Sequence, residues 1–443
     1  MVSTIRVLHI TAHLGGGIGK VLSRLVEESA RSQDGVRHTI ATLEALEKSQ
    51  FADHIQAHGG NLYISPTMDE LNGLAACADI VQLEWWHHPA MAAWICSGNL
   101  PPMRLIVWSH VSGLHPPQIL PNFVRAPHRF LFTSPCSLEH PALSQLEHDA
   151  KQRTATVFSS GGFDDLPKPP RHSENKPLRI GYVGTLNFAK LHPQLMDYLA
   201  AVDLPGFQLS MIGDPTTGNE LWAQAQARGM ADRLELRGYC TNIAENLAGF
   251  DVFAYLLNPL HYGTTENALL EAMAMGVVPI ALDNPAERQL IRNGETGLLI
   301  DSPKSFADAL SFLTNHPDQR QRLAMNAATE IRHRFSVTNT CNTLNLHFAA
   351  VIGEEKRSFD FRSIFGNRPA DWFRSCQGEQ IWRFTDMLTD TPSNTHVGPH
   401  YLYEMTKGSA FHYHSTFPED PRLAAWVKNL ENHRTKSNQK QLT

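Results

Sequence analysis

The chain has 443 residues, which is more than one ordinary domain holds and predicts two or three domains. Hydrophobic residues make up 42% of it and charged residues 19%, the profile of a globular protein with a sizeable core. The net charge of −6, without a dense Lys/Arg run, argues against nucleic acid as a partner and against a basic helix on a membrane surface.

The sequence also bears on targeting and redox chemistry. It opens without a long apolar leader and contains no stretch near roughly 18 apolar residues, so we expect neither a signal peptide nor a transmembrane helix. The six cysteines are scattered without a CxxC pair, which indicates reduced thiols. Together these features predict a cytoplasmic protein.

Apolar segments of strand length alternate with helical patterns from the start, beginning with a strand over 5–10 and a helical pattern over 21–27. We expect further strands at 38–43, 61–64, 79–83, 104–109, 129–133 and 156–159. This alternation predicts a parallel sheet covered by helices on both faces. Residues 1–165 are predicted to form this first domain.

A proline-rich polar segment without periodicity, 166–177, predicts a linker. The alternation then restarts and defines a second domain, 178–335. Residues 336–443 lose the alternation but keep many aromatic residues, so we expect a mainly helical C-terminal extension with a frayed polar end. The strands expected in the second domain are 178–184, 208–213, 233–237, 251–256, 277–282 and 297–300, and the helices are 193–202, 305–313 and 319–334.

A glycine-rich segment, Gly15–Lys20, follows the first predicted strand. Glycines let the backbone approach a ligand closely, and the following helix offers a positive dipole end, as a phosphate site requires. A Walker A loop does not fit, because Leu14 and Val21 occupy positions that need Gly and Ser or Thr, and GxGxxG lacks its third glycine. The alternative is a tight turn that packs helix on sheet, but the place at the carboxyl end of a strand favours a ligand.

Two segments of the second domain are candidates for anion binding. Lys190 follows the strand ending at Gly184 and could meet a diphosphate as a point charge, or it could be a solvated surface lysine. A polar glycine loop over 261–265 precedes a helix over Glu266–Met275 and a buried strand over 277–282. The free N–H groups of such a helix start suit a phosphate, although ordinary α/β units have the same arrangement.

Carboxylates and histidines complete the candidate set. Glu271 lies in an otherwise apolar helix and needs a partner if it is buried, which ribose hydroxyls could provide. Glu266 and Glu271 do not share a helix face closely, so they are not an obvious acid/base pair. Several histidines follow strands of the first domain, but none has zinc-ligand spacing, so we expect no metal site. His110 is expected to be a hydrogen-bonded core or acceptor-site residue.

Taken together, these segments resemble the retaining, nucleotide-sugar-dependent glycosyltransferases of family 4. The resemblance covers most of 5–335 and is most specific at 266–282, which is similar to the donor-binding helix and next strand of that family. It implies an α/β fold of the GT-B type, with two Rossmann-like domains facing across a cleft. Supporting motifs, in chain order, are Gly15–Gly17, Tyr182–Leu186 with Lys190, Met211–Asp214, Leu236–Tyr239, Phe250–Phe253 and Asn293–Leu298.

The resemblance also implies roles for single residues. Gly16 and Gly17 would lie near the donor phosphates, and Lys190 would compensate the diphosphate as it becomes a leaving group. Glu271 would accept hydrogen bonds from the ribose, and His110 would lie beside the transferred sugar. The start of the donor helix would contact phosphate or sugar through Glu266, Asn267 and Ala268.

Two positions depart from the family pattern. The family pattern has two Glu residues separated by seven positions. If Glu271 is the second of them, the first falls on Gly263. The Arg that commonly follows the strand glycine is Thr185 here. We still expect both positions to lie in the donor site, where Glu266 could replace the missing carboxylate.

The resulting hypothesis is a cytoplasmic enzyme that moves a sugar from a nucleoside-diphosphate sugar to an acceptor hydroxyl with retention, in polysaccharide or glycoconjugate synthesis. The acceptor would be a saccharide or lipid-linked, with peripheral membrane contact allowed, and no cofactor or metal is expected. One alternative is a non-catalytic GT-B scaffold that binds sugar nucleotide or a protein partner. The other is a sugar-nucleotide epimerase, which needs additional acid/base carboxylates.

Overall fold

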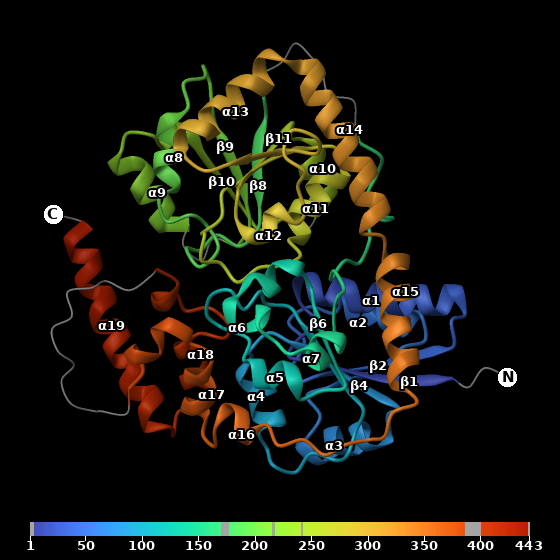
Figure 1. Ribbon diagram of the computed structural model, residues 1–443. Coiled ribbons are helices and arrows are strands. Elements are labelled where there is room, and N and C mark those ends of the chain that lie inside the picture. The colour runs from blue at the N-terminus through green and yellow to red at the C-terminus, as the bar shows by residue number, and fades with distance from the viewer. Residues whose placement is uncertain (1–3, 170–176, 215–217, 241, 386–399, 442–443) are drawn as a thin grey trace. The chain divides into compact units, whose positions relative to one another are not determined.

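The computed structural model describes residues 4–169, 177–214, 218–240, 242–385 and 400–441. The chain divides into two units, each built on one parallel sheet (Figure 1). The first unit comprises Met1–Gly161, Tyr262–Thr264 and Val337–Thr443, and the second comprises Gly162–His261 and Thr265–Ser336. The centre of the predicted linker, 170–176, lies outside the described residues.

The sheet of the first unit has seven parallel strands in the order β3-β2-β1-β4-β5-β6-β7. The order reverses between β1 and β4, which is the place where open α/β sheets bind ligands beyond the carboxyl ends of their strands. The first six strands expected in this part of the chain are present with ends shifted by at most two residues, whereas the strand expected at 156–159 overlaps β7 only at Thr156. The strands are β1 (Ile5–Thr11), β2 (Val36–Thr42), β3 (Asn61–Ile64), β4 (Ile80–Trp85), β5 (Leu105–Ser109), β6 (Arg129–Phe132) and β7 (Thr154–Thr156).

Helices cover both faces of this sheet. Those before residue 162 are α1 (Gly16–Ser32), α2 (Gln50–Ala57), α3 (Met68–Cys77), α4 (Pro89–Ile95), α5 (Pro121–Arg125), η1 (Pro135–Glu139), α6 (Pro141–Ser144) and α7 (His148–Gln152). The extension adds α15 (Val337–Val351), α16 (Arg362–Phe365), α17 (Pro369–Ser375), η3 (Gly378–Arg383), η4 (His400–Tyr403), α18 (Ala410–Thr416) and α19 (Pro421–Gln441).

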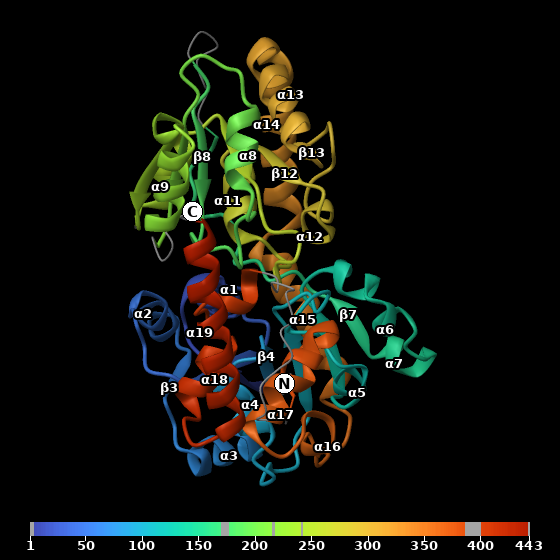
Figure 2. The same ribbon diagram turned by 90° about the vertical axis from the view of Figure 1, so that its left-hand side faces the viewer.

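The extension is part of the first unit rather than a separate appendage. Helix α15 lies beside α1 on one face of the sheet, whereas α17 and α18 pack on α4 (Figures 1 and 2). The expectation of a mainly helical extension is confirmed. The polar end that we expect to fray falls in α19, which extends to Gln441, and the fraying stays a prediction.

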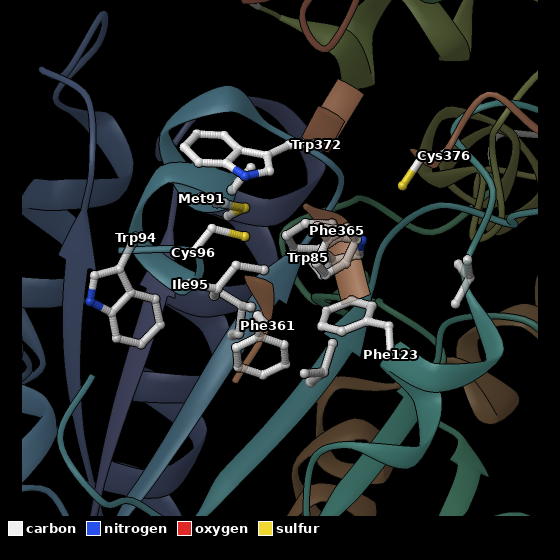
Figure 3. Packing of buried hydrophobic residues seen from close by; sticks show 14 of the residues in the cluster. Trp85, Met91, Trp94, Ile95, Cys96, Phe123, Phe361, Phe365, Trp372 and Cys376 are labelled. Carbon is white, nitrogen blue, oxygen red and sulfur yellow. The ribbon is translucent and has the colours of Figure 1, made fainter. Parts of the chain in front are cut away.

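The alternation of side chains along each strand separates two cores. On the α1 side, Val7 and Ile40 of the sheet are buried with Leu344 and Phe348 of α15. On the other side, the sheet and α4 bury their apolar residues against aromatic rings of the extension (Figure 3). There the ring of Trp85 lies 5.6 Å from that of Phe365, measured between centroids. The first unit therefore completes its core only with residues from both ends of the chain.

The sheet of the second unit has six strands in the order β10-β9-β8-β11-β12-β13, all parallel, and its order reverses between β8 and β11. All the strands expected in this domain are present. They are β8 (Ile180–Val183), β9 (Leu209–Ile212), β10 (Leu234–Gly238), β11 (Val252–Tyr255), β12 (Val278–Leu282) and β13 (Leu298–Ile300). The helices are α8 (Leu195–Ala201), α9 (Gly218–Ala227), η2 (Ala231–Arg233), α10 (Ile243–Ala248), α11 (Asn267–Ala274), α12 (Pro285–Arg288), α13 (Pro303–Asn315) and α14 (Pro317–Arg334).

Two expectations about helix starts need correction. The glycine-rich segment is not a loop, because Gly15 is the N-cap of α1 and the helix already begins at Gly16. Gly16 has a φ of +57°, which a residue with a side chain rarely adopts. The helix expected from Glu266 begins one residue later, at Asn267, so that Glu266 is the N-cap residue of α11. Gly276 follows α11 with a φ of +73°, as the C′ position of a helix favours.

Candidate active site

A hydrogen-bonded turn after β8 presents Lys190. The carbonyl and Oδ1 of Asn187 both accept from the Lys190 N–H, at 3.1 and 3.0 Å. The Lys190 carbonyl accepts from the N–H of Asn258 at 2.8 Å, and Asn258 Nδ2 donates to the Phe188 carbonyl at 2.8 Å. These bonds fasten the turn to the segment that follows β11, on the two strands that flank the reversal in strand order.

Glu266 joins this turn to α11. Its Oε2 lies 2.5 Å from Lys190 Nζ and 2.5 Å from the hydroxyl of Tyr255, while its Oε1 lies 3.8 Å from Nδ1 of His261. The Glu266 side chain is 5% exposed and that of Lys190 is 18% exposed. Although Glu266 is the N-cap residue of α11, its side chain makes no capping bond. The carboxylate is therefore held by the lysine and the tyrosine.

The surroundings of Glu266 and Tyr255 keep the carboxyl group ionised and the phenol neutral. Burial acts to raise the pKa of Glu266, but the positive charge of Lys190, with His261, outweighs burial and lowers the pKa below its ordinary value. Burial, together with the Glu266 carboxylate, raises the pKa of Tyr255 well above its ordinary value. Glu266 is thus an acceptor and Tyr255 a neutral donor at physiological pH.

A second buried carboxylate stands behind this group. Nε2 of His261 lies 3.1 Å from Oε1 of Glu287, and both side chains are almost completely inaccessible. His261 therefore lies between Glu266 and Glu287. Sequence reasoning missed Tyr255, His261 and Glu287, because a charged residue shows its burial, and hence its need for a partner, only in the folded chain.

The other predicted donor residues of the second unit lie around this pair. Thr185 is exposed, and its carbonyl accepts from the Tyr182 hydroxyl at 3.2 Å. Asn267 and Ala268 form the partly exposed first turn of α11, and Glu271 is half-buried farther along the helix. The structure thus brings Lys190 and Glu266 into direct contact, which the sequence did not predict.

The remaining predicted residues belong to the first unit. Gly263 is one of them, because the short segment Tyr262–Thr264 is part of that unit. Gly16 and Gly17 form the accessible first turn of α1. His110 follows β5, its N–H donates to the Trp85 carbonyl at 2.7 Å, and its Nε2 lies 2.9 Å from Oε2 of Glu84. Glu84 is fully buried, so the structure assigns His110 a carboxylate partner that the sequence did not reveal.

Two groups of His and Glu bring their polar atoms within 4.8 Å of one another among the described residues. The first is Glu44, His88 and His412. Nδ1 of His88 accepts from the N–H of Ala90 at 3.1 Å, and Nδ1 of His412 accepts from the N–H of Gly408 at 2.9 Å. In the neutral ring the proton is then on Nε2, the nitrogen facing Glu44, where a metal would need a lone pair. This group is therefore better suited to hydrogen bonding than to a metal.

The second group comprises Glu27, His54 and His58. Arg24 already places its Nη1 at 2.6 Å from the carboxylate of Glu27, and His54 Nε2 lies 3.0 Å from the same oxygen. A cation beside the acidic ligand disfavours a second cation. The absence of a functional metal remains a prediction.

Along the part of the chain that the structure describes, no helix combines the length and the apolar character needed to cross a membrane.

Comparison with known proteins identifies the second unit. Residues 177–316 match the family Glycosyl transferases group 1. This segment is therefore similar to the group 1 glycosyltransferases. It contains Lys190, Glu266 and Glu271, so the geometry described above lies within the matched region.

Two curated glycosyltransferases are similar to this chain. LpsE, a lipopolysaccharide core biosynthesis glycosyltransferase of Rhizobium meliloti, is 27% identical over 139 residues, or 31% of this chain and 40% of LpsE. WbpZ, a D-rhamnosyltransferase of Pseudomonas aeruginosa, is 23% identical over 363 residues, or 75% of this chain and 92% of WbpZ. The chain thus spans less than half of the first relative and most of the second.

A solved structure extends the likeness in fold to both units. HepE of Anabaena, crystallised in complex with UDP, superposes with a TM-score of 0.63 at 14% identity, covering 78% of this chain and 100% of HepE. At this identity the likeness concerns the fold alone. The predicted GT-B fold is confirmed.

Proposed function

We propose that this protein is an active enzyme that moves a sugar from a nucleoside-diphosphate sugar to an acceptor hydroxyl with retention of configuration. The observation that carries the proposal is the contact between Lys190 and Glu266 at the start of α11, where the order of strands reverses. Breaking the bond between the sugar and the diphosphate leaves negative charge on the phosphate. A fixed cation in a partly buried site stabilises that charge as it develops.

Lys190 suits this task in both position and charge. Its ammonium group carries three N–H donors, so it can hold Glu266 and a phosphate oxygen together. Glu266 and the turn around Asn187 restrict the position of Lys190, which reduces the reorganisation needed when the donor binds. The first turn of α11, with Asn267 and Ala268, would add backbone N–H groups. Lysine and helix start thus supply the positive charge without a metal in the proposal.

The remaining assignments follow the resemblance. Glu271 would bind the ribose, and Thr185 and Gly263 would line the donor site. His110, Gly16 and Gly17 of the first unit would contact the transferred sugar and its phosphates. Glu266 is proposed to position Lys190 and to replace the carboxylate missing at Gly263.

What is known of similar proteins supports the proposed substrate class. HepE has been crystallised with UDP and with UDP-glucose, and LpsE and WbpZ are named as glycosyltransferases, LpsE of the lipopolysaccharide core. We therefore propose a nucleoside-diphosphate sugar as donor and a growing glycan, free or lipid-linked, as acceptor. Polysaccharide or glycoconjugate synthesis in the cytoplasm is the corresponding setting.

Donor binding and turnover test this proposal. Purified full-length protein is screened by thermal shift against UDP-, GDP- and ADP-sugars, and donors that bind are then tested for hydrolysis and transfer. A donor present at a hundred times its Kd should stabilise the protein by about 2.7 kcal/mol. Stabilisation by none of these sugar nucleotides would contradict a transferase. Binding without turnover would favour a non-catalytic scaffold.

Variants locate the site. Lys190→Ala and Glu271→Ala should each weaken donor use. Lys304→Ala is a matched control, since Lys304 pairs with Asp308 on the exposed surface of α13 and should leave donor use unchanged. Full activity in both site variants would show that the site is misplaced.

A further inference from the structure

A chain of hydrogen bonds runs through the interior of the first unit and joins two carboxylates through two histidines and a serine. His9 Nδ1 lies 2.8 Å from Glu84 Oε1, and His9 Nε2 lies 2.9 Å from Nδ1 of His38. His38 Nε2 lies 2.9 Å from Oγ of Ser29, which lies 2.8 Å from Oδ2 of Asp34. His9 and Glu84 are fully buried, and His38 and Ser29 nearly so. None of the residues in this hydrogen-bond network has a role in the proposed function.

The sheet order explains why these residues meet. Glu84, His9 and His38 come from β4, β1 and β2, which are neighbouring strands. All three lie on the face covered by α1, which supplies Ser29. The first two links thus cross directly from strand to strand.

Counting protons shows that neutral histidines do not suffice. Besides the longer contacts of Cys341 Sγ with Ser29 Oγ at 3.5 Å and Asp34 Oδ2 at 3.4 Å, the network contains four hydrogen bonds, and each of these four needs one proton. A neutral His9, a neutral His38 and the Ser29 hydroxyl supply one proton each, and the carboxylates at the two ends only accept. One further proton must therefore lie within this hydrogen-bond network.

Both carboxylates are in acceptor environments. Glu84 also accepts from Gln82 Nε2 at 2.8 Å, and its other oxygen faces His110 Nε2 at 2.9 Å. Burial acts to raise the pKa of Glu84, but its hydrogen bonds from His110 and His9 keep it below the ordinary value. At the other end Asp34 accepts from the Val36 N–H at 2.9 Å and from Asn345 Nδ2 of α15 at 2.8 Å.

The two histidines are not equivalent. Burial and the neighbouring His9 lower the pKa of His38 to about 3, so His38 is neutral. His9 lies in direct contact with the Glu84 carboxylate, which stabilises a positive charge on its ring. With His9 doubly protonated, all four bonds are satisfied: His9 donates to Glu84 and His38, His38 donates to Ser29, and Ser29 donates to Asp34.

We propose that His9 is an imidazolium in the folded protein and that its ion pair with Glu84 positions His110. Glu84 stays ionised because His9 carries the compensating charge within the core. Its second oxygen then accepts from Nε2–H of His110, which fixes that tautomer and leaves Nδ1 of His110 as an acceptor. The His110 side chain is 13% exposed, and in the proposed function its Nδ1 would accept a hydrogen bond from a hydroxyl of the transferred sugar.

Nuclear magnetic resonance of the full-length protein, labelled with ¹⁵N in histidine, tests the assignment of protons at pH 7. His9 should show both ring nitrogens protonated, whereas His38 and His110 should be neutral with the proton on Nε2. A neutral His9 in the wild-type spectrum would overturn the proposal. This measurement needs no variant and does not depend on the proposed function.

Glu84→Gln tests the positioning role. It should neutralise His9, remove the tautomer preference of His110 and lower kcat by about 10- to 100-fold, as for the partner that orients a functional histidine. The Kd of the donor, measured by thermal shift, should change less than kcat. Glu84→Asp, which keeps the charge, should restore the imidazolium if Glu84→Gln folds poorly. Asn345→Ala is the control, because it changes only the Asp34 end and should leave His110 unaltered.

The outcomes separate the two proposals. An unchanged His110 tautomer in Glu84→Gln would overturn the positioning role. Expected spectra in a wild-type protein that turns over no sugar nucleotide would support the proton assignment and contradict the proposed function alone.

Discussion

A single carboxylate oxygen, Oε2 of Glu266, lies 2.5 Å from Nζ of Lys190 and 2.5 Å from the hydroxyl of Tyr255. The ammonium group and the phenol therefore share one acceptor atom of a buried carboxylate. Since Lys190 and Glu266 are 76 positions apart in sequence, their contact also ties the turn after β8 to the start of α11. Because each partner can be replaced separately, the contribution of each contact to the free energy of unfolding can be measured.

Lys190→Met should destabilise the protein by about 3 kcal/mol, because it leaves the buried charge of Glu266 without its cation. Adding Glu266→Gln should recover much of this loss, since the second change removes the uncompensated charge. Urea unfolding of the two single variants and the double variant gives the coupling free energy. A double variant no more stable than Lys190→Met would contradict the ion pair.

Tyr255→Phe should lower the free energy of unfolding by about 1.5–3 kcal/mol, because a hydrogen bond to a charged acceptor is lost. Tyr182→Phe provides the matched comparison. Its ring lies 5.8 Å from that of Tyr255, but its hydroxyl donates to a neutral carbonyl at 3.2 Å, so the expected loss is about 1 kcal/mol. Equal losses, measured by denaturant unfolding, would argue against a special role for Tyr255.

Stability should fall on acidification below pH about 6.5. Burial lowers the pKa of His87 from 6.5 to about 4, so the unfolded chain binds a proton that the folded chain excludes. Stability from this group is complete above the unfolded pKa and is lost as pH falls toward 4, by at most about 3 kcal/mol. His87→Gln, whose amide can still donate to the Trp372 carbonyl, should flatten the dependence of the unfolding free energy on pH. An unchanged slope would show that His87 binds its proton equally in the folded and the unfolded chain, and would contradict this prediction.

Phe365→Ala should destabilise the protein by about 3–5 kcal/mol, because this extension residue is 2% exposed and packs on Trp85. Trp382→Ala removes an even larger ring from the same extension, but Trp382 is 45% exposed and its loss should cost far less. Thermal unfolding compares the two. Similar costs would show that the extension is not part of the core of the first unit.

Local patterns were sufficient to predict the sheets. Strands such as 251–256 and 277–282 are continuous apolar runs, and both strands appear at those positions as β11 and β12. The helix start at Gly16 was not predicted, since glycine has low helix propensity and only the fold imposes a helix there. The helices of the extension are too short to show a clear periodicity, so their packing on the sheet could not be predicted from the sequence.

The site was predictable only in part, for a physical reason. A resemblance in motif assigned Lys190, Glu266 and Glu271 to one donor site, but it gave no pairing among them. His9 and Glu84 each lie between apolar residues of a buried strand. A polar side chain in such a position is stable only with a buried partner. Such partners come from other strands, so sequence spacing does not identify them.

The division of the chain has a consequence for biosynthesis. The second unit is made almost entirely of Gly162–His261 and Thr265–Ser336, whereas the first needs Val337–Thr443 to complete both of its cores. During translation the strands of residues 5–156 thus emerge before α15 and α19, whose residues complete the two cores. The second unit, which comes from the middle of the chain, can therefore fold before the first unit has all of its residues.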